Sequence, residues 1–197
     1  SFRNHGYTGD RIDHRPRNQG FLTADEYLAH SKATVIFAMF GYNASFDNDP
    51  AAFQSALSIW IQHTRSSDYS GHGAPKIVLF SPTAAEDLRN PNLADAGALN
   101  EQLGAISGAM QSTAEAEGVT FVDLFTPTLH HFTMTAREPM TVNGVHLNEA
   151  GHHVVGKLIA KALYGQETTQ DEARLQSIHK AVVDKNWHWF NRYRATD

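Results

Sequence analysis

The fold of this chain follows from the stretch Thr34-Val35-Ile36-Phe37-Ala38-Met39-Phe40-Gly41-Tyr42-Asn43. From Val35 to Phe40 every side chain is apolar, without the alternation of a strand that has one face in water. Such a run is typical of a short strand buried on both faces, and strands of that kind belong to parallel sheets covered by helices. Gly41 ends the run, so we expect the chain to turn there.

Further apolar runs of the same kind predict more strands. They lie at Lys76–Phe80 and Val119–Leu124, and the first residues, 1–3, resemble the end of another strand. Between the runs, apolar residues recur at helical spacing, and Thr23 with Glu26 forms a capping box at the start of one such segment. Helices are therefore predicted at about 23–31, from 47–50 to 65, at 96–117 and at 148–164.

The alternation of strands and helices predicts an α/β fold of three layers, with helices on both faces of a parallel, flavodoxin-like sheet. This domain is expected to occupy residues 1–166. Residues 167–197 are predicted to form a C-terminal helical extension, because apolar residues recur at helical spacing over 171–193. Its aromatic residues are expected to pack on the domain or on an additional domain or subunit. They are Trp187, Trp189, Phe190 and Tyr193.

The composition argues against several classes of function. The 197 residues include 16 Lys and Arg against 21 Asp and Glu, and the net charge of −5 argues against a general nucleic-acid binder. Cysteine is absent, so disulfides and thiolate chemistry are excluded. No apolar run approaches the roughly 20 residues that span a bilayer. The start at Ser1, without Met or leader, and the abrupt end at Asp197 lead us to expect a piece of a longer polypeptide.

The histidines do not suggest a metal site. Four of them form the adjacent pairs His130-His131 and His152-His153. Side chains of adjacent residues diverge, unlike the i, i+4 pair that binds zinc on a helix, so we predict no metal and no cofactor. His146 is different, because it stands on a glycine-containing loop directly before a helix that Asn148 caps. Loops at the carboxyl ends of strands carry the chemistry of open α/β sheets.

Two other loops that follow predicted strands carry complementary groups. They are Asn4-His5-Gly6-Tyr7-Thr8-Gly9-Asp10 and Gly41-Tyr42-Asn43. A glycine amide and an asparagine side-chain amide can both donate hydrogen bonds to an oxyanion. A histidine nearby can act as a general base. Because the strand ends of a parallel sheet gather at one edge, we expect Gly9, Asn43 and His146 to converge there.

These blocks and their order resemble the SGNH (GDSL-type) hydrolase family over roughly residues 2–164. In that family, the glycine of the second block and the asparagine of the third form the oxyanion hole, and the histidine of the fifth block is the base. The resemblance implies these roles for Gly9, Asn43 and His146. It also favours a periplasmic or extracellular location. The tail from Lys185 to Arg194 resembles one that follows SGNH domains in some large bacterial multidomain proteins.

The nucleophile block of the family, Gly-Asp-Ser, is not in this chain. In the family it precedes the block that contains Gly9, so the nucleophilic serine is expected upstream of Ser1. Two serines of the chain follow strands, Ser45 and Ser81, but both are typical of turn or cap residues rather than nucleophiles.

The acid position of the fifth block also departs from the family pattern. Asn143 stands where the family has an aspartate, three residues before His146. An amide oxygen can accept the imidazole N–H and fix its tautomer, but it supplies no charge, and losing that charge can cost a serine triad about 10⁴ in turnover. Asp123, at a strand end, is a second candidate for the orienting role, although a solvated carboxylate is the simpler interpretation.

Two functions fit these observations. The first is a serine ester hydrolase that removes an O-acyl or acetyl group from a carbohydrate or another small ester. The second is a non-catalytic SGNH-like module that binds or assembles within a larger protein, which the missing block, Asn143 and the aromatic tail favour. The sequence that precedes Ser1 in the full protein would discriminate between them.

Overall fold

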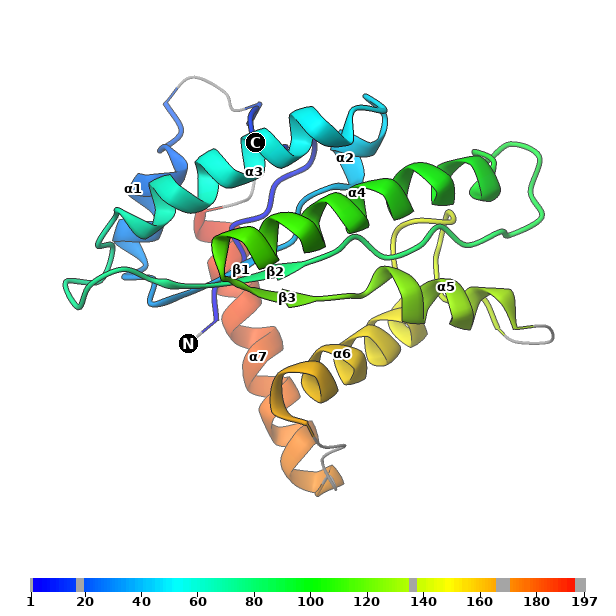
Figure 1. Ribbon diagram of the computed structural model, residues 1–197. Helices are drawn as coiled ribbons and strands as arrows, with labels where there is room; N and C mark the ends of the chain where they lie inside the picture. Colours follow the sequence, from blue (N-terminus) through cyan, green and yellow to red (C-terminus); the bar gives the residue numbers. More distant parts are fainter. Residues whose placement is uncertain (1, 17–19, 135–137, 166–170, 194–197) are drawn as a thin grey trace. The chain divides into compact units, whose positions relative to one another are not determined.

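The computed structural model describes residues 2–16, 20–134, 138–165 and 171–193. The chain divides into two compact units, Gly6–Gly165 and a smaller one drawn from Ser1–His5 and Gln166–Asp197. The larger unit holds the sheet and helices α1 to α6, and the smaller unit holds α7 (Figure 1). No helix in the described ranges is long and apolar enough to cross a membrane.

Three short strands form the sheet of the larger unit. They are β1 (Val35–Ala38), β2 (Lys76–Phe80) and β3 (Thr120–Val122), which lie side by side in chain order. Both pairs are parallel, with Val35 opposite Lys76 and Val78 opposite Thr120. The prediction of a parallel α/β sheet is confirmed. Burial on both faces holds for β2, where Ile77 to Phe80 are buried, but not for β1, where Val35 is 48% exposed and Ala38 is the buried residue.

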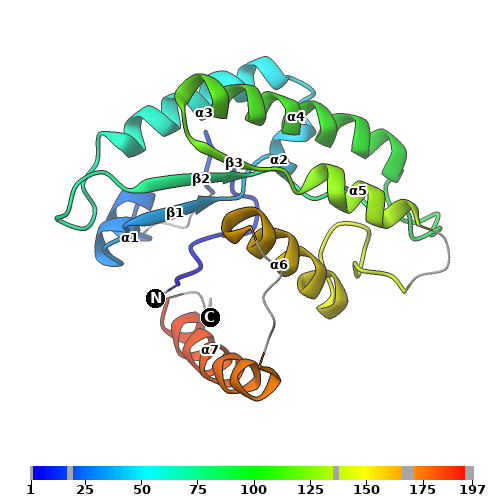
Figure 2. The ribbon, with the colours of Figure 1, turned by 60° about the horizontal axis from the view of Figure 1, so that its bottom comes forward.

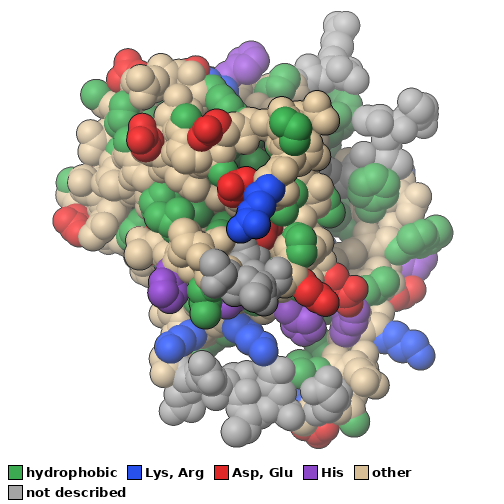
Figure 3. Space-filling view, turned by 90° about the vertical axis from the view of Figure 1, so that its right-hand side faces the viewer, with side chains coloured by type: hydrophobic (Ala, Val, Ile, Leu, Met, Phe, Trp, Pro, Cys, Tyr) green, Lys and Arg blue, Asp and Glu red, His purple; other side chains and the backbone are tan. Residues whose placement is uncertain are grey.

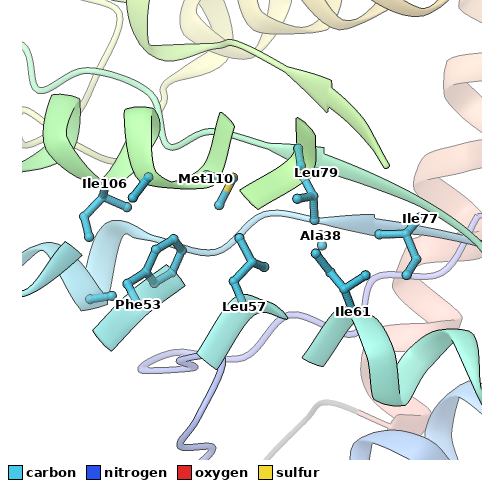
Figure 4. Packing of buried hydrophobic residues seen from close by; sticks show 11 residues of the cluster. Ala38, Phe53, Leu57, Ile61, Ile77, Leu79, Ile106 and Met110 are labelled. Atoms are coloured by element: carbon cyan, nitrogen blue, oxygen red, sulfur yellow. The ribbon is translucent and has the colours of Figure 1, made fainter. Parts of the chain in front are cut away.

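Successive residues of the central strand face opposite layers of helices, as the twofold repeat of a strand requires. Ile77 and Leu79 pack with Ala38 against α3 (Pro50–Arg65) and α4 (Ala96–Glu117) (Figure 4). The helix residues in this cluster include Phe53, Leu57, Ile61, Ile106 and Met110. Because Leu57, Ile61 and Leu79 are completely buried, this side of the sheet forms the main core.

The other face of the sheet is covered by α6 (Glu149–Tyr164). Val78 and Phe80 of β2 and Val122 of β3 form a second buried cluster with Val155 of that helix. Figure 2 shows α3 and α4 on one side of the strands and α6 on the other. The larger unit therefore has helices on both faces of its sheet.

Helix boundaries in the larger unit fall at several residues that the sequence indicates. Thr23 and Glu26 form the predicted capping box at the start of α1 (Ala24–His30). At its end, α4 stops at Gly118, and α6 starts at Asn148, whose side chain accepts a hydrogen bond from the Gly151 amide at 3.0 Å. Local capping chemistry therefore sets these boundaries.

The sequence analysis misses two helices, α2 (Tyr42–Ser45) and α5 (Phe125–Thr133). The second begins directly after β3 because side chains satisfy its first amides. The Ser81 hydroxyl accepts hydrogen bonds from two of them and the Asp123 carboxylate from a third. His130 and His131 therefore lie on a helix rather than on a loop.

The smaller unit pairs α7 (Glu172–Tyr193) with the first residues of the chain. Lys185 Nζ donates to the carbonyl of Phe2 at 2.9 Å, and Trp189 Nε1 donates to the carbonyl of Asn4 at 3.0 Å. Helix side chains, rather than a neighbouring strand, satisfy these carbonyl groups. Residues 2 and 3 form no strand, so the predicted strand end is wrong for them, and Ser1 lies outside the described residues.

Candidate active site

The segments that follow the strands lie at the carboxyl edge of the sheet, on the right-hand side of Figure 1. There α2 follows β1, the irregular segment 81–95 follows β2, and α5 follows β3. Residues 140–148, here called the histidine loop, return to the same side before α6 (Figure 1). Figure 3 shows this face, on which the Lys and Arg side chains are scattered rather than gathered in a patch. Ligands of open α/β sheets bind at this edge.

Residues 6–13, here called the glycine loop, are held against α2. Gly9 has a φ of +82°, a left-handed conformation that glycine adopts without strain. Asn43 Nδ2 donates to the carbonyl of the neighbouring Asp10 at 2.9 Å, so Asn43 lies beside the residue that follows Gly9. A side-chain amide carries two N–H groups, and this contact uses one of them.

Arg11 also ties the glycine loop to the chain that follows α2. Its guanidinium forms an ion pair with Asp13 at 3.1 Å, inside the loop, and another with Asp47. Hydrogen bonds to Asp47 and then to Asp13 raise the pKa of Arg11. The same hydrogen bonds hold the pKa of each carboxyl group below its ordinary value of 3.8. Because all three side chains are partly exposed, each pair contributes little stability.

Asn143 and His146 are in direct contact in the histidine loop. Asn143 Oδ1 accepts hydrogen bonds from the backbone amides of His146 at 2.9 Å and Val145 at 3.3 Å. The same oxygen lies 3.1 Å from His146 Nδ1, the contact expected from the three-residue spacing. It fits the tautomer in which Nδ1 carries the proton and donates it, and the opposite nitrogen, Nε2, is then an acceptor.

The histidine loop is a tight hairpin. Thr141 and Leu147 form an antiparallel bridge, and the amide of Val142 donates to the carbonyl of His146 at 2.8 Å. At the tip, Gly144 has a φ of +84°, and a Cβ added there would lie 3.0 Å from the carbonyl oxygen of Glu86. Both the conformation and the space require glycine, so the backbone that carries His146 has little freedom.

A buried carboxylate, Glu86, contacts the loop from the segment after β2. It is 4% exposed, and it accepts hydrogen bonds from the Thr141 hydroxyl at 2.6 Å and from the Met140 amide at 3.0 Å. The sequence analysis misses this residue, because a single glutamate in a polar stretch between a strand and a helix resembles a solvated side chain. What distinguishes Glu86 is that its side chain is buried, and the sequence alone does not show this.

The Asn43–Asp10 contact and the Asn143–His146 contact each lie next to a residue that packs on one apolar cluster. Tyr42, next to Asn43, and Val145, next to His146, both pack against a cluster of buried residues. The buried residues are Ala85, Leu99 and Leu103. Tyr42 and Val145, the chain neighbours of Asn43 and His146, therefore pack on the same cluster.

Neither of the two serines considered as nucleophiles presents a usable hydroxyl. Ser45 is completely buried, and its hydroxyl donates to the carbonyl of Tyr42 at 2.7 Å. Ser81, 2% exposed, accepts the two amides at the start of α5. Asp123 accepts a third amide of that helix at 3.1 Å and thus serves as a cap. Contacts with His146 come from Asn143 instead.

The adjacent histidine pairs lie on two different helices. His130 and His131 are on α5, and His152 and His153 are on α6. Within the described ranges, no three His, Cys, Asp or Glu side chains are grouped so that they could hold a metal ion.

Solved esterases share this fold. An aryl esterase of M. smegmatis is 17% identical over 79% of this chain and 74% of its own, with a TM-score of 0.54. A variant of an acetyl xylan esterase from Geobacillus stearothermophilus is 14% identical over 72% of this chain, with a TM-score of 0.53. The chain spans 64% of that enzyme, less than two thirds of its length. No curated protein matches the chain.

The family comparison covers the whole candidate site. Residues 1–154 match the GDSL-like lipase/acylhydrolase family, and this span contains the glycine loop, the histidine loop and the first turn of α6. It therefore includes the Asn43–Asp10 contact and the Asn143–His146 contact. By this match over most of its length, the chain belongs to the GDSL-like lipase/acylhydrolase family.

Proposed function

We propose that the chain forms the larger part of an ester-hydrolase site that works by acyl transfer. The observation that carries the proposal is the contact between Asn143 Oδ1 and His146 Nδ1, at 3.1 Å. This contact favours the tautomer in which Nε2 accepts a proton. A serine hydroxyl at Nε2 would lose its proton to the ring while its oxygen attacks the ester carbonyl.

The attack converts the carbonyl oxygen into an oxyanion, for which Gly9 and Asn43 are the proposed donors. Gly9 would supply its backbone amide, and Asn43 the N–H that does not contact Asp10. Because the Asp10 carbonyl already holds the other N–H at 2.9 Å, the Asn43 side chain is oriented before any substrate binds. Donors fixed in advance stabilise developing charge most effectively.

The nucleophilic serine is proposed to lie in sequence that precedes Ser1, because the family's nucleophile block comes before the block containing Gly9. Protonated His146 would then give its proton to the leaving alkoxide, which departs as an alcohol. Water, deprotonated by the same ring, would attack the acyl-serine, release the carboxylic acid and restore the serine.

As substrate we propose a small O-acyl ester, with an acetylated carbohydrate as the first candidate. The acetyl xylan esterase and the aryl esterase of the same fold support this class. Asn143 predicts modest turnover, because an amide orients the imidazole without stabilising the imidazolium by charge.

The test uses the full-length protein and initial rates on an acetylated xylooligosaccharide and an aryl acetate. His146→Ala should lower kcat/KM by about 10²–10⁴-fold, the usual contribution of a general base. Asn43→Ala should lower kcat by about 10²–10³-fold, the usual effect of removing one oxyanion donor. His153→Ala, an exposed histidine of α6, is the matched control and should leave the rates unchanged. Full activity in His146→Ala would exclude this mechanism.

Asn143 also favours a second candidate, a non-catalytic SGNH-like module that binds or assembles within a larger protein. A site that has lost its chemistry no longer needs the carboxylate of the acid position. The aromatic end of α7, including Trp187 and Phe190, is the contact region proposed for this case. The full-length protein would then hydrolyse neither ester. The position of the family's nucleophilic serine would hold another residue type.

A further inference from the structure

We infer that Glu86 is a positioning residue for His146, since its buried side chain and its backbone together fix the histidine loop. The inference rests on the proposed function, which makes His146 the base. It adds to the site a residue of the segment that follows β2, far from His146 in sequence.

The carboxylate of Glu86 accepts hydrogen bonds from the start of the histidine loop. The Met140 amide lies 3.2 Å from Oε1 and 3.0 Å from Oε2, and the Thr141 hydroxyl lies 2.6 Å from Oε2. Glu86 and Thr141 are 4% and 3% exposed. Water therefore cannot easily replace these hydrogen bonds, and bonds to an ionised acceptor are among the strong ones.

From there the contacts reach the tip of the loop by two routes. The Thr141 hydroxyl donates to Glu86 and accepts from the Gly144 amide at 3.0 Å. The backbone amide of Glu86 donates to the Gly144 carbonyl at 2.8 Å. The amide and the carbonyl of Gly144 are thus both held by hydrogen bonds. Gly144 lies between Asn143 and the two residues, Val145 and His146, whose amides donate to the Asn143 side chain. Fixing Gly144 therefore fixes the turn that orients the imidazole.

Glu86 is itself held by two helices. Asn100 of α4 pairs with both backbone groups of Ala85, accepting from its amide at 2.7 Å and donating to its carbonyl at 2.9 Å. Thr128 of α5 accepts from the amide of Ala84 at 2.9 Å. Because this segment is anchored to the helices of the fold, Glu86 can transmit their rigidity to the histidine loop.

A purely structural carboxylate offers the matched comparison. Glu117, at the end of α4, accepts hydrogen bonds from the Ser58 hydroxyl and from Gln62 Nε2, both on α3. Like Glu86, it accepts from a hydroxyl and from an N–H donor, and it also forms an ion pair with Arg65 of α3 at 3.6 Å, so its contacts join two helices. Glu117→Gln and Glu86→Gln therefore make the same chemical change in two different places.

The experiment measures amide hydrogen exchange and kinetics in the full-length protein carrying each variant. Glu86→Gln should accelerate exchange at the Gly144 and Met140 amides by about tenfold or more relative to the core amide of Leu79, since buried donors lose an acceptor. It should lower kcat more than it changes KM. Glu117→Gln should change neither the loop amides nor kcat.

Thr141 supplies a second pair of variants, which keeps the test decisive if Glu86→Gln does not fold. Thr141→Val removes the hydroxyl and should reproduce the fast exchange at Gly144, whereas Thr141→Ser retains it and should restore slow exchange. Equal acceleration at Gly144 and Leu79, with kcat unchanged, would overturn the inference. If the parent protein hydrolyses no ester, the proposed function fails, but the exchange rates still decide whether Glu86 holds the loop.

Discussion

The two loops of the candidate site are held in different ways. The histidine loop depends on buried groups, among them Glu86 and Thr141, and on hydrogen bonds that close its hairpin. The glycine loop depends on the ion pairs of Arg11, in which the side chains of Asp13 and Asp47 are 51% and 47% exposed. Water replaces an exposed partner but not a buried one. We therefore expect single substitutions to disturb the histidine loop more than the glycine loop.

The largest effect should come from a methyl group placed between the histidine loop and α6. A Cβ at Gly151 would lie 2.1 Å from the carbonyl oxygen of Met140 and 3.0 Å from Leu147 Cδ2. Because the first of these is a backbone atom, the loop must move. We expect Gly151→Ala to lower the free energy of unfolding by about 3 kcal/mol, in the range of overpacked cores. Chemical denaturation measures this change.

Gly156, in the same helix, is the control. A Cβ added there meets nothing within 4 Å, so Gly156→Ala should stabilise the protein by up to about 1 kcal/mol through helix propensity. If Gly151→Ala is tolerated as well as Gly156→Ala, the histidine loop is not packed as tightly as the structure shows, and the contrast between the two loops disappears.

The next effect concerns the turn at Asn143. Asn143→Ala removes the acceptor of two backbone amides and of His146 Nδ1, and should lower kcat by about tenfold. Asn143→Asp keeps the acceptor and adds a charge beside the ring. It should raise kcat by at least about tenfold.

Initial rates in the full-length protein test both substitutions. An Asn143→Ala protein with the kcat of the parent would show that Asn143 does not orient the ring in solution. The orienting role would then belong to another acceptor.

Sequence patterns predicted the strands and the helix ends that depend on residues close together in the chain. The apolar runs gave β1 and β2, and Asn148 gave the start of α6. What they missed depends on residues far away in sequence. The first amides of α5 are capped by Ser81, 43 residues before Leu124, and Glu86 contacts Met140, 54 residues later. Periodicity carries no information about such partners, so the positioning of the histidine loop could only come from the structure.

A smaller effect is expected in the glycine loop. Arg11→Gln removes both ion pairs, yet the Asn43–Asp10 hydrogen bond remains. Exchange of the Asp10 amide should accelerate by no more than about fivefold, as for exposed ion pairs. The acceleration should shrink further in 1 M salt, where the screening length falls to about 3 Å. An acceleration as large as that expected at Gly144 in Glu86→Gln would show that single substitutions disturb the two loops equally.

The smallest effect is one of pH, and its sign follows from Arg11. Hydrogen bonds from Arg11 hold the pKa of Asp13 and of Asp47 below 3.8. A carboxyl group whose folded pKa lies below its unfolded value adds stability above the unfolded value, and that stability is lost as the pH falls through the folded value. The ion pairs of the glycine loop should therefore persist at pH 5 and weaken only below about pH 4, the ordinary range of an aspartate.

Carboxyl-carbon NMR titrations of the parent protein and of Arg11→Gln measure this directly. In the parent, Asp13 and Asp47 should titrate below 3.8, and in Arg11→Gln both should move upward towards it. Asp68 is the control, because backbone amides, that of Gly73 first, hold its pKa below 3.8, so its titration should be the same in both proteins. If Asp13 and Asp47 titrate alike with and without Arg11, the ion pairs do not form in solution. The glycine loop would then depend on the Asn43–Asp10 hydrogen bond. Its contrast with the histidine loop, which the buried hydrogen bonds of Glu86 hold, would be greater still.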